Sequence, residues 1–144
     1  MITRIGHCAI RARDIEKTAH FYTAVLGMQE AFRMFDPVDG TVASIHIYVA
    51  PSQFIEIFPH GSQECPLKKD SIGHSHICYE VDDAAAYCAL VCSRGAPLDS
   101  ELKRGASKCI QFWTHDPDGN SIEFMELPPD CLQVAANNRI ASRQ

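Results

Sequence analysis

The stretch Ser75-His-Ile-Cys-Tyr-Glu-Val81 restarts a pattern that the chain has already shown at Arg4-Ile-Gly-His-Cys-Ala-Ile-Arg11. Both stretches are expected to form strands, and each is followed by Asp residues that can cap a helix, Asp14 in one case and Asp82 and Asp83 in the other. Three further strand-like segments come after each expected helix. Each half of the chain is therefore predicted to fold as β-α-β-β-β.

Apolar residues at helical spacing predict that the first helix extends to Leu26 and that Gly27 ends it. The same spacing predicts a second helix over residues 84–94, which Gly95 is expected to end. The strands that follow are expected at 28–36, 41–49 and 53–59 in the first half, and near 98–102, 108–115 and 120–127 in the second. Residues 60–72 are expected to form a loop between the halves.

Matching chemical groups recur at a nearly fixed offset. His7 and His76 are 69 residues apart, and Glu56 and Glu123 are 67 residues apart. Such an offset indicates an internal repeat. A half of about 60 residues is marginally stable alone, so the halves are expected to need each other or a second chain.

We therefore expect one domain over residues 1–127, made of module one (3–60) and module two (73–127). The segment 128–144 is polar and contains few large apolar side chains. It is expected to be either a loose terminus or an arm that lies on a partner subunit.

Strand alternation places Glu56 on one face of its strand and Ile55 and Ile57 on the other. A carboxylate in such a strand is costly to bury without a partner. Two Glu and two His at repeat-related positions offer one common partner, a divalent metal such as Zn, Ni, Co, Mn or Fe(II). The alternative is that each residue is a satisfied structural polar group. That alternative is preferred for any one of them alone, and the metal is preferred for all four in repeat register.

Other side chains that alternation places beside this set have competing explanations. His74 lies on the same face as His76, but we prefer His76 because it is deeper in the expected strand. His46 faces the same concavity, where it would contact a substrate, although a plain surface His explains it equally well. Trp113 would wall an apolar pocket, although core packing is the safer explanation.

Composition and charge exclude several classes of protein. The net charge of −5 comes with 13 scattered Lys and Arg residues and no basic stripe, so nucleic acid is not an expected partner. No stretch of 18 apolar residues predicts a membrane span, and the start of the chain lacks the apolar run of a signal peptide. The seven cysteines are odd in number and form no Cys-x-x-Cys pair, which indicates free thiols and a cytoplasmic location.

Four motifs together resemble the vicinal oxygen chelate superfamily, which includes glyoxalase I, methylmalonyl-CoA epimerase, extradiol dioxygenases, fosfomycin-resistance enzymes and bleomycin-binding proteins. The motifs are His7-Cys-Ala-Ile-Arg11, Phe21-Tyr22 with Leu26-Gly27, His76-Ile-Cys-Tyr-Glu-Val81 and Asp116-Pro-Asp-Gly-Asn-x-Ile-Glu123. The resemblance covers residues 3–127. It implies an α+β fold in which two βαβββ modules form a cupped mixed sheet around a metal site.

The ligand set implied by the resemblance consists of His7, Glu56, His76 and Glu123. It looks like that of bacterial glyoxalase I, whose members use nickel or cobalt and in some cases zinc. Extradiol dioxygenases and fosfomycin enzymes resemble a three-ligand pattern instead, and the epimerase typically has Gln where Glu56 stands. The resemblance also implies a homodimer, and it leaves open whether the modules pair within one chain or are swapped between two.

Five further positions correspond to substrate contacts of glyoxalase I. Arg11 matches an Arg that contacts glutathione, and His60 stands where glyoxalase I has an Asn for glutathione. Lys103, Arg104 and Lys108 are the cations of the loop that would bind the glycine carboxylate of glutathione.

The function that follows from the resemblance is that of a metal-dependent lyase or isomerase of the glyoxalase I type. The metal would stabilise an enediolate of a small substrate with two neighbouring oxygens, such as the hemithioacetal of methylglyoxal and glutathione. Glu56 or Glu123 would be the general base. The alternatives are an Fe(II) dioxygenase of catechol-like rings, a fosfomycin transferase, and a protein that binds a drug or another small molecule without turnover.

Overall fold

A computed structural model describes residues 2–63 and 72–142 of the chain. The chain divides into two compact units, and both have the predicted order of elements. The first unit contains the first half of the chain together with Asp116–Asp118, and the second contains Gly73–His115 and the chain from Gly119 onward. The prediction of an α+β fold built from two βαβββ modules is confirmed.

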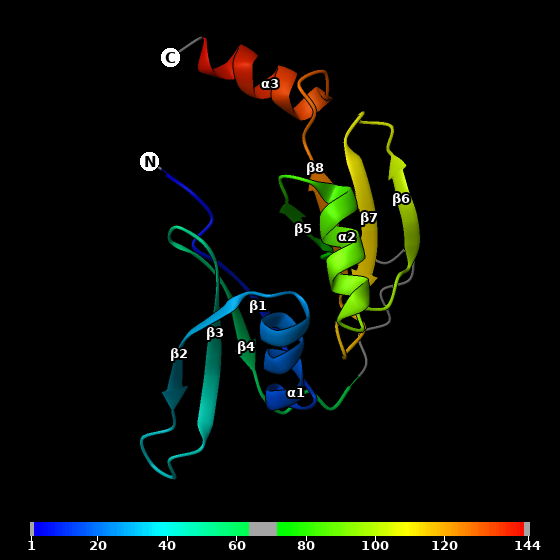
Figure 1. The fold of residues 1–144 in the computed structure, drawn as a ribbon. Coiled ribbons are helices and arrows are strands. Elements are labelled where there is room, and N and C mark those ends of the chain that lie inside the picture. The colour runs from blue at the N-terminus through cyan, green and yellow to red at the C-terminus, as the bar shows by residue number, and fades with distance from the viewer. Residues whose placement is uncertain (1, 64–71, 143–144) are drawn as a thin grey trace. The chain divides into compact units, whose positions relative to one another are not determined.

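The first unit contains one four-stranded mixed sheet in the order β1-β4-β3-β2 (Figure 1). Its elements are β1 (His7–Arg11), α1 (Ile15–His20), the π-helical turn η1 (Phe21–Val25), β2 (Gln29–Phe35), β3 (Val42–Ala50) and β4 (Gln53–Phe58). Strand β1 runs parallel to β4, whereas the other two neighbouring pairs are antiparallel. The only departure from the expected helix is that it changes to π geometry at Phe21 before it ends.

Helix α1 begins and ends where the sequence predicts. The Asp14 carboxylate accepts hydrogen bonds from the backbone N–H groups of Glu16 and Lys17, both at 3.1 Å, which is the arrangement of an N-cap. Gly27 follows η1 with φ +77°, a conformation that favours glycine. The helical segment packs on β3 and β4, where Ile45 and Ile57 are fully buried.

The second unit repeats this arrangement with a sheet in the order β5-β8-β7-β6 (Figure 1). Its elements are β5 (Ile77–Glu80), α2 (Ala84–Ser93), β6 (Ser100–Arg104), β7 (Ile110–His115), β8 (Ser121–Glu126) and α3 (Leu132–Ala141). Strands β5 and β8 are parallel. The core between α2 and the sheet includes Phe112 and Phe124, whose rings stack at 5.1 Å.

The segment that follows β8 contains a helix that the sequence did not predict. Helix α3 has no buried residue, and its first N–H group, that of Leu132, donates to the carbonyl of Ser107 at 2.9 Å. Among the described residues, no helix is long and apolar enough to cross a membrane.

Candidate metal centre

The face of the first sheet opposite α1 holds a carboxylate at its middle. Ile55 and Ile57 of β4 are buried toward the helix, so alternation directs Glu56 to the other face. The Glu56 side chain is nevertheless only 13% exposed. Its charge therefore needs local partners.

His7 of β1 is the first of these partners. Its Nε2 lies 3.5 Å from Oε2 of Glu56, and 54% of the His7 side chain is exposed. The two residues lie on adjacent parallel strands, with Ala9 in register with Glu56. The unit thus brings together one predicted His ligand and one predicted Glu ligand.

His46 of β3 is a second partner. Its Nε2 lies 3.2 Å from Oε1 of Glu56, the oxygen that does not face His7. His46 is buried, and its ring stacks on Phe32 with a centroid distance of 4.1 Å and an interplanar angle of 17°. The hydroxyl of Ser44 is 3.3 Å from the same Nε2. These contacts contradict the expectation that a surface His explains this position equally well.

The second unit brings together the other predicted pair. Nε2 of His76 lies 3.3 Å from Oε2 of Glu123, and Glu123 is buried at 9% exposure. His76 precedes the first residue of β5, so it lies at the end of the strand rather than deep within it. The competing candidate, His74, is exposed.

Two further side chains border this second pair. Trp113 is the cross-strand neighbour of Glu123, and its ring meets the ring of His76 edge-on at 4.7 Å. Cys78 is the neighbour of Glu123 on β5. Burial, with the nearby Glu123 carboxylate, raises the pKa of the Cys78 thiol to about 12. That thiol is therefore neutral at physiological pH.

His46 and Trp113 lie closer to the candidate ligands than the sequence alone indicates. Each is the cross-strand neighbour of one of the two Glu residues, and they lie 67 residues apart, the same offset as between Glu56 and Glu123. That shared offset is the signal that could have identified them as a pair.

The donor atoms of each pair fit a metal ion. Two ligands on a tetrahedral ion with bonds near 2.1 Å lie about 3.4 Å apart. The imidazole and carboxylate atoms of the two pairs are separated by 3.5 Å and 3.3 Å. Within the described ranges, no three His, Cys, Asp or Glu side chains meet closely enough to hold a metal. Each unit by itself therefore brings together only two of the four candidate ligands.

Two of the predicted substrate contacts lie in the first unit. Arg11 is on the same face of β1 as His7, its Nη1 donates to the carbonyl of Pro59 at 2.8 Å, and its guanidinium lies 5.4 Å from the centre of the Phe58 ring. His60 is exposed and has φ +66°.

The other three lie at the hairpin of β6 and β7. Lys103 is exposed on β6, and Lys108 is exposed in the turn with φ +66°. Arg104 is an exception because its Nη2 binds both oxygens of Asp130 at 2.5 and 2.6 Å. This ion pair lowers the pKa of Asp130 and neutralises the guanidinium locally.

Comparisons with known proteins agree with this architecture. The sequence model of the Glyoxalase/Bleomycin resistance protein/Dioxygenase superfamily matches residues 4–124. A lactoylglutathione lyase from Pseudomonas putida is 27% identical over 86% of this chain and 85% of its own. The human mitochondrial methylmalonyl-CoA epimerase is 31% identical over 80% of this chain and 68% of its own.

Solved structures show the same fold. A glyoxalase family protein from Enterococcus faecalis superposes with a TM-score of 0.73 at 23% identity, and the match covers 85% of this chain and 97% of that one.

Proposed function

Because the chain belongs to the glyoxalase/bleomycin resistance protein/dioxygenase superfamily, we propose that it is a metal-dependent lyase of the glyoxalase I type. The observation that supports this most is that each unit presents one His–Glu pair at repeat-related positions. The four side chains His7, Glu56, His76 and Glu123 would hold one divalent ion between them. Two imidazoles and two carboxylates suit Ni, Co, Zn, Mn or Fe(II).

The chemistry needs a proton to move between two neighbouring carbons of the substrate. When bound, a divalent ion supplies Lewis acidity to two adjacent substrate oxygens. Glu56 or Glu123 would remove the proton from the carbon that bears the hydroxyl group and return it to the adjacent carbonyl carbon. The substrate is isomerised, so no external oxidant or reductant is consumed.

Two observations support a substrate class: the names of the relatives, and the polar residues that match substrate contacts of glyoxalase I. Lactoylglutathione lyases are among the relatives, which favours a hemithioacetal of methylglyoxal and a thiol such as glutathione. Arg11, His60, Lys103 and Lys108 would contact the thiol part. Arg104 is a weaker candidate because Asp130 already binds its guanidinium.

A direct assay tests the proposal. The purified protein would be loaded separately with Ni²⁺, Co²⁺ and Zn²⁺ and given methylglyoxal with glutathione, while formation of the thioester is followed by its absorbance. We expect turnover that depends on both the metal and the thiol. Absence of thioester formation with every metal, from protein shown to contain the ion, would reject the lyase.

A second candidate is acyl-CoA epimerisation, because the human epimerase is 31% identical. That reaction also removes a proton next to a carbonyl group, so the same carboxylates would serve. The two activities are separated by asking whether the protein exchanges the α-proton of methylmalonyl-CoA with D2O. Oxygen consumption with a catechol and Fe(II) would instead identify a dioxygenase.

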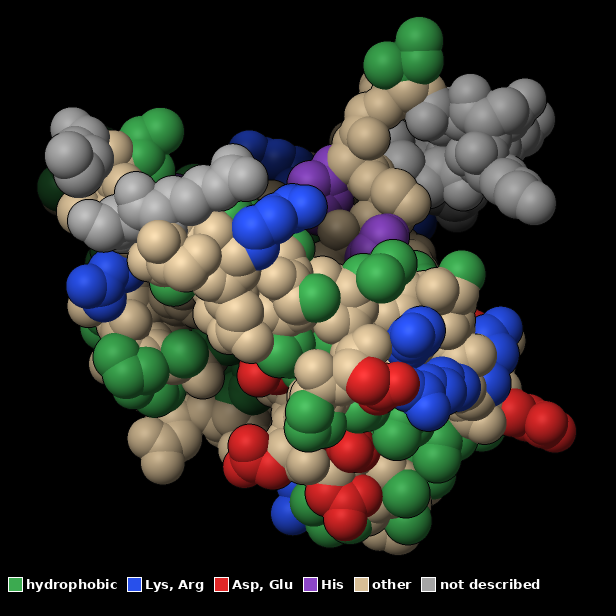
Figure 2. All heavy atoms as spheres, turned by 90° about the horizontal axis from the view of Figure 1, so that it is seen from above, with side chains coloured by type: hydrophobic (Ala, Val, Ile, Leu, Met, Phe, Trp, Pro, Cys, Tyr) green, Lys and Arg blue, Asp and Glu red, His purple; other side chains and the backbone are tan. Residues whose placement is uncertain are grey.

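We further propose that the protein is a homodimer. Large apolar side chains that are exposed in each unit support this proposal, because a subunit interface would cover them. The exposed fraction is 92% for Val38 and 59% for Phe35 in the first unit, and 57% for Leu132 in the second. Figure 2 shows hydrophobic side chains exposed at several places on one face of the molecule, among acidic and basic ones.

A further inference from the structure

The two halves of the proposed metal site differ at one equivalent position. The strand neighbour across from Glu56 is His46, whereas the neighbour across from Glu123 is Trp113. An imidazole can bind a carboxylate oxygen head-on through its ring nitrogen. Both oxygens of Glu56 therefore have an imidazole nitrogen nearby, that of His7 at 3.5 Å and that of His46 at 3.2 Å. Among the described residues, Glu123 has one such neighbour, because only His76 faces it.

The chemistry of the two groups decides which of them would be the hydrogen-bond donor between His46 and Glu56. Nε2 of His46 lies 3.2 Å from Oε1 of Glu56. Because an ionised carboxylate only accepts hydrogen bonds, a hydrogen bond between these atoms requires the hydrogen on Nε2. The ring is held in that orientation because it is stacked on Phe32 at 4.1 Å and is buried. Phe32, His46 and Glu56 are consecutive cross-strand neighbours on β2, β3 and β4, so the sheet register itself fixes the row.

We propose that His46 is a positioning residue that holds the Glu56 carboxylate by its Oε1 and leaves Oε2, the oxygen that faces His7, available to bind a metal ion. This inference rests on the proposed metal centre and deepens it. Groups that orient a metal ligand typically change metal affinity by about 10–100-fold when they are removed. His46 would act through Glu56 and is not itself counted among the four ligands.

The same difference in neighbours predicts different roles for the two carboxylates, Glu56 and Glu123. Glu56, restrained at both oxygens, would remain a fixed ligand. Among the described residues, Glu123 faces one imidazole, and its strand neighbours are the indole ring of Trp113 and the neutral thiol of Cys78. It would be the carboxylate that takes and returns the proton.

Two substitutions, His46→Gln and His46→Asn, both place an amide at position 46 but put its nitrogen at different distances from the backbone. They test whether the position of the hydrogen-bond donor matters, and not only the presence of a polar group. The amide nitrogen of Gln reaches about as far from the backbone as Nε2 of His, whereas that of Asn is one carbon shorter. We expect His46→Gln to bind Co²⁺ within about threefold of wild type, and His46→Asn to bind it about 10–100-fold more weakly. Affinity would be measured by competition with a chelator. The visible absorption of bound Co²⁺ would report any change of ligand geometry.

Two further proteins complete the experiment. His46→Phe preserves a ring to stack on Phe32 but removes the donor, so we expect it to bind Co²⁺ as weakly as His46→Asn. The exposed His20 on α1 provides the matched control, because His20→Phe makes the same exchange away from the site and should leave Co²⁺ affinity unchanged. Thermal unfolding without metal would check that all variants are folded.

The outcomes separate this inference from the proposed function. If His46→Asn and His46→Phe bind Co²⁺ as tightly as wild type while Glu56→Ala loses affinity, the metal centre stands and the role of His46 is overturned. If the wild-type protein itself does not bind Co²⁺, the proposed metal centre fails, and the role of His46 fails with it. Equal losses in the Gln and Asn variants would also overturn the positioning role.

Discussion

At the scale of single residues, Glu56 and Glu123 are the side chains whose placement most needs an explanation. Each lies in a strand between apolar neighbours that are buried under a helix, and each is itself nearly buried. The free energy cost of burying a charge is offset when the group is paired or binds a metal. Each carboxylate has an imidazole beside it, and the proposed metal would be shared by both pairs.

Glu123→Gln is the substitution that tests the proton-transfer role. The amide keeps the shape of the side chain but cannot accept a proton, so turnover should fall by about 10²–10⁴-fold. The rate should be expressed per metal-loaded protein, with metal content measured in the same sample. Full activity with the metal still bound would contradict the assignment of Glu123.

The sequence identified the candidate ligands but not their surroundings. Alternation and the repeated offset were enough to select His7, Glu56, His76 and Glu123, because both are properties of linear spacing. The importance of His46 depends on which residue of β3 lies opposite Glu56, and that depends on the length of the turn at Pro51 and Ser52. Strand register of this kind is set by the folded sheet.

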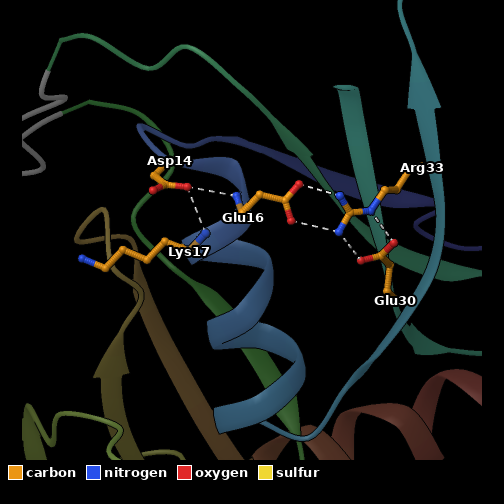
Figure 3. A network of polar contacts seen from close by, with 5 residues as sticks. All are labelled: Asp14, Glu16, Lys17, Glu30 and Arg33. Carbon is orange, nitrogen blue, oxygen red and sulfur yellow. Dashed lines mark hydrogen bonds and ion pairs between the residues drawn. The ribbon is translucent and has the colours of Figure 1, made fainter. Parts of the chain in front are cut away.

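At the scale of elements, an ion-pair network joins α1 to β2 (Figure 3). The guanidinium of Arg33 on β2 binds both oxygens of Glu16 on α1 and both oxygens of Glu30 on β2, at 2.5–3.0 Å. The Arg33 hydrogen bonds lower the pKa of Glu30, and the two carboxylates raise the pKa of Arg33. The planar fork of Arg suits this double contact, whereas Lys offers a single charged atom.

Arg33→Lys should therefore lower the free energy of unfolding by about 1 kcal/mol at pH 7, since the network is partly exposed. The pKa of Glu30 is lowered in the folded protein, so its stabilisation is present at neutral pH and is lost as the pH falls through its folded value. The difference between variant and wild type should shrink below about pH 4. Urea unfolding at pH 7 and pH 3 measures this difference in stability. A difference that does not change with pH would contradict the contribution of the Glu30 carboxylate.

A second contact involves the turn residue Asp118, which belongs to the first unit. Its carboxylate accepts hydrogen bonds from the hydroxyl of Thr18 at 2.8 Å and from the backbone N–H of Arg13 at 3.1 Å. Thr18 is fully buried on α1.

Thr18→Val removes only the hydroxyl and leaves an oxygen of Asp118 without that donor. We expect the free energy of unfolding to fall by about 1–3 kcal/mol. Thr18→Ser retains the hydroxyl and should recover the larger part of the loss. Chemical denaturation of the three proteins gives the comparison, and equal stability of Val and Ser variants would show that the hydrogen bond contributes nothing.

The elements were predicted well where local chemistry marks their ends. Asp14, Asp83, Gly27 and Gly95 are caps or stops both in the sequence and in the structure. Helix α3 was missed because Asn137 and Asn138 favour other conformations and because no residue of the helix is buried. The usual sequence signals of a helix are a capping residue and an apolar face that packs on a core. Neither marks residues 132–141.

At the scale of the whole molecule, the proposed four-ligand metal centre needs a His–Glu pair from each of two units. Whether the second pair comes from the same chain or from a partner depends on how modules associate, which linear spacing does not encode. The proposed homodimer predicts that light scattering of the purified protein gives twice the mass of one chain at micromolar concentration. A mass of one chain in a sample that has full metal content and activity would contradict it.

Metal analysis by mass spectrometry of the purified protein and of Glu56→Ala tests the metal centre most directly. We expect close to one Ni, Co, Zn, Mn or Fe ion per chain in the wild type, and a clear loss of that metal in Glu56→Ala. Metal retained unchanged in Glu56→Ala would remove Glu56 from the ligand set and favour a three-ligand dioxygenase or transferase. No metal in the wild type, even after reconstitution, would contradict the metal centre and leave a protein that binds a small molecule without turnover.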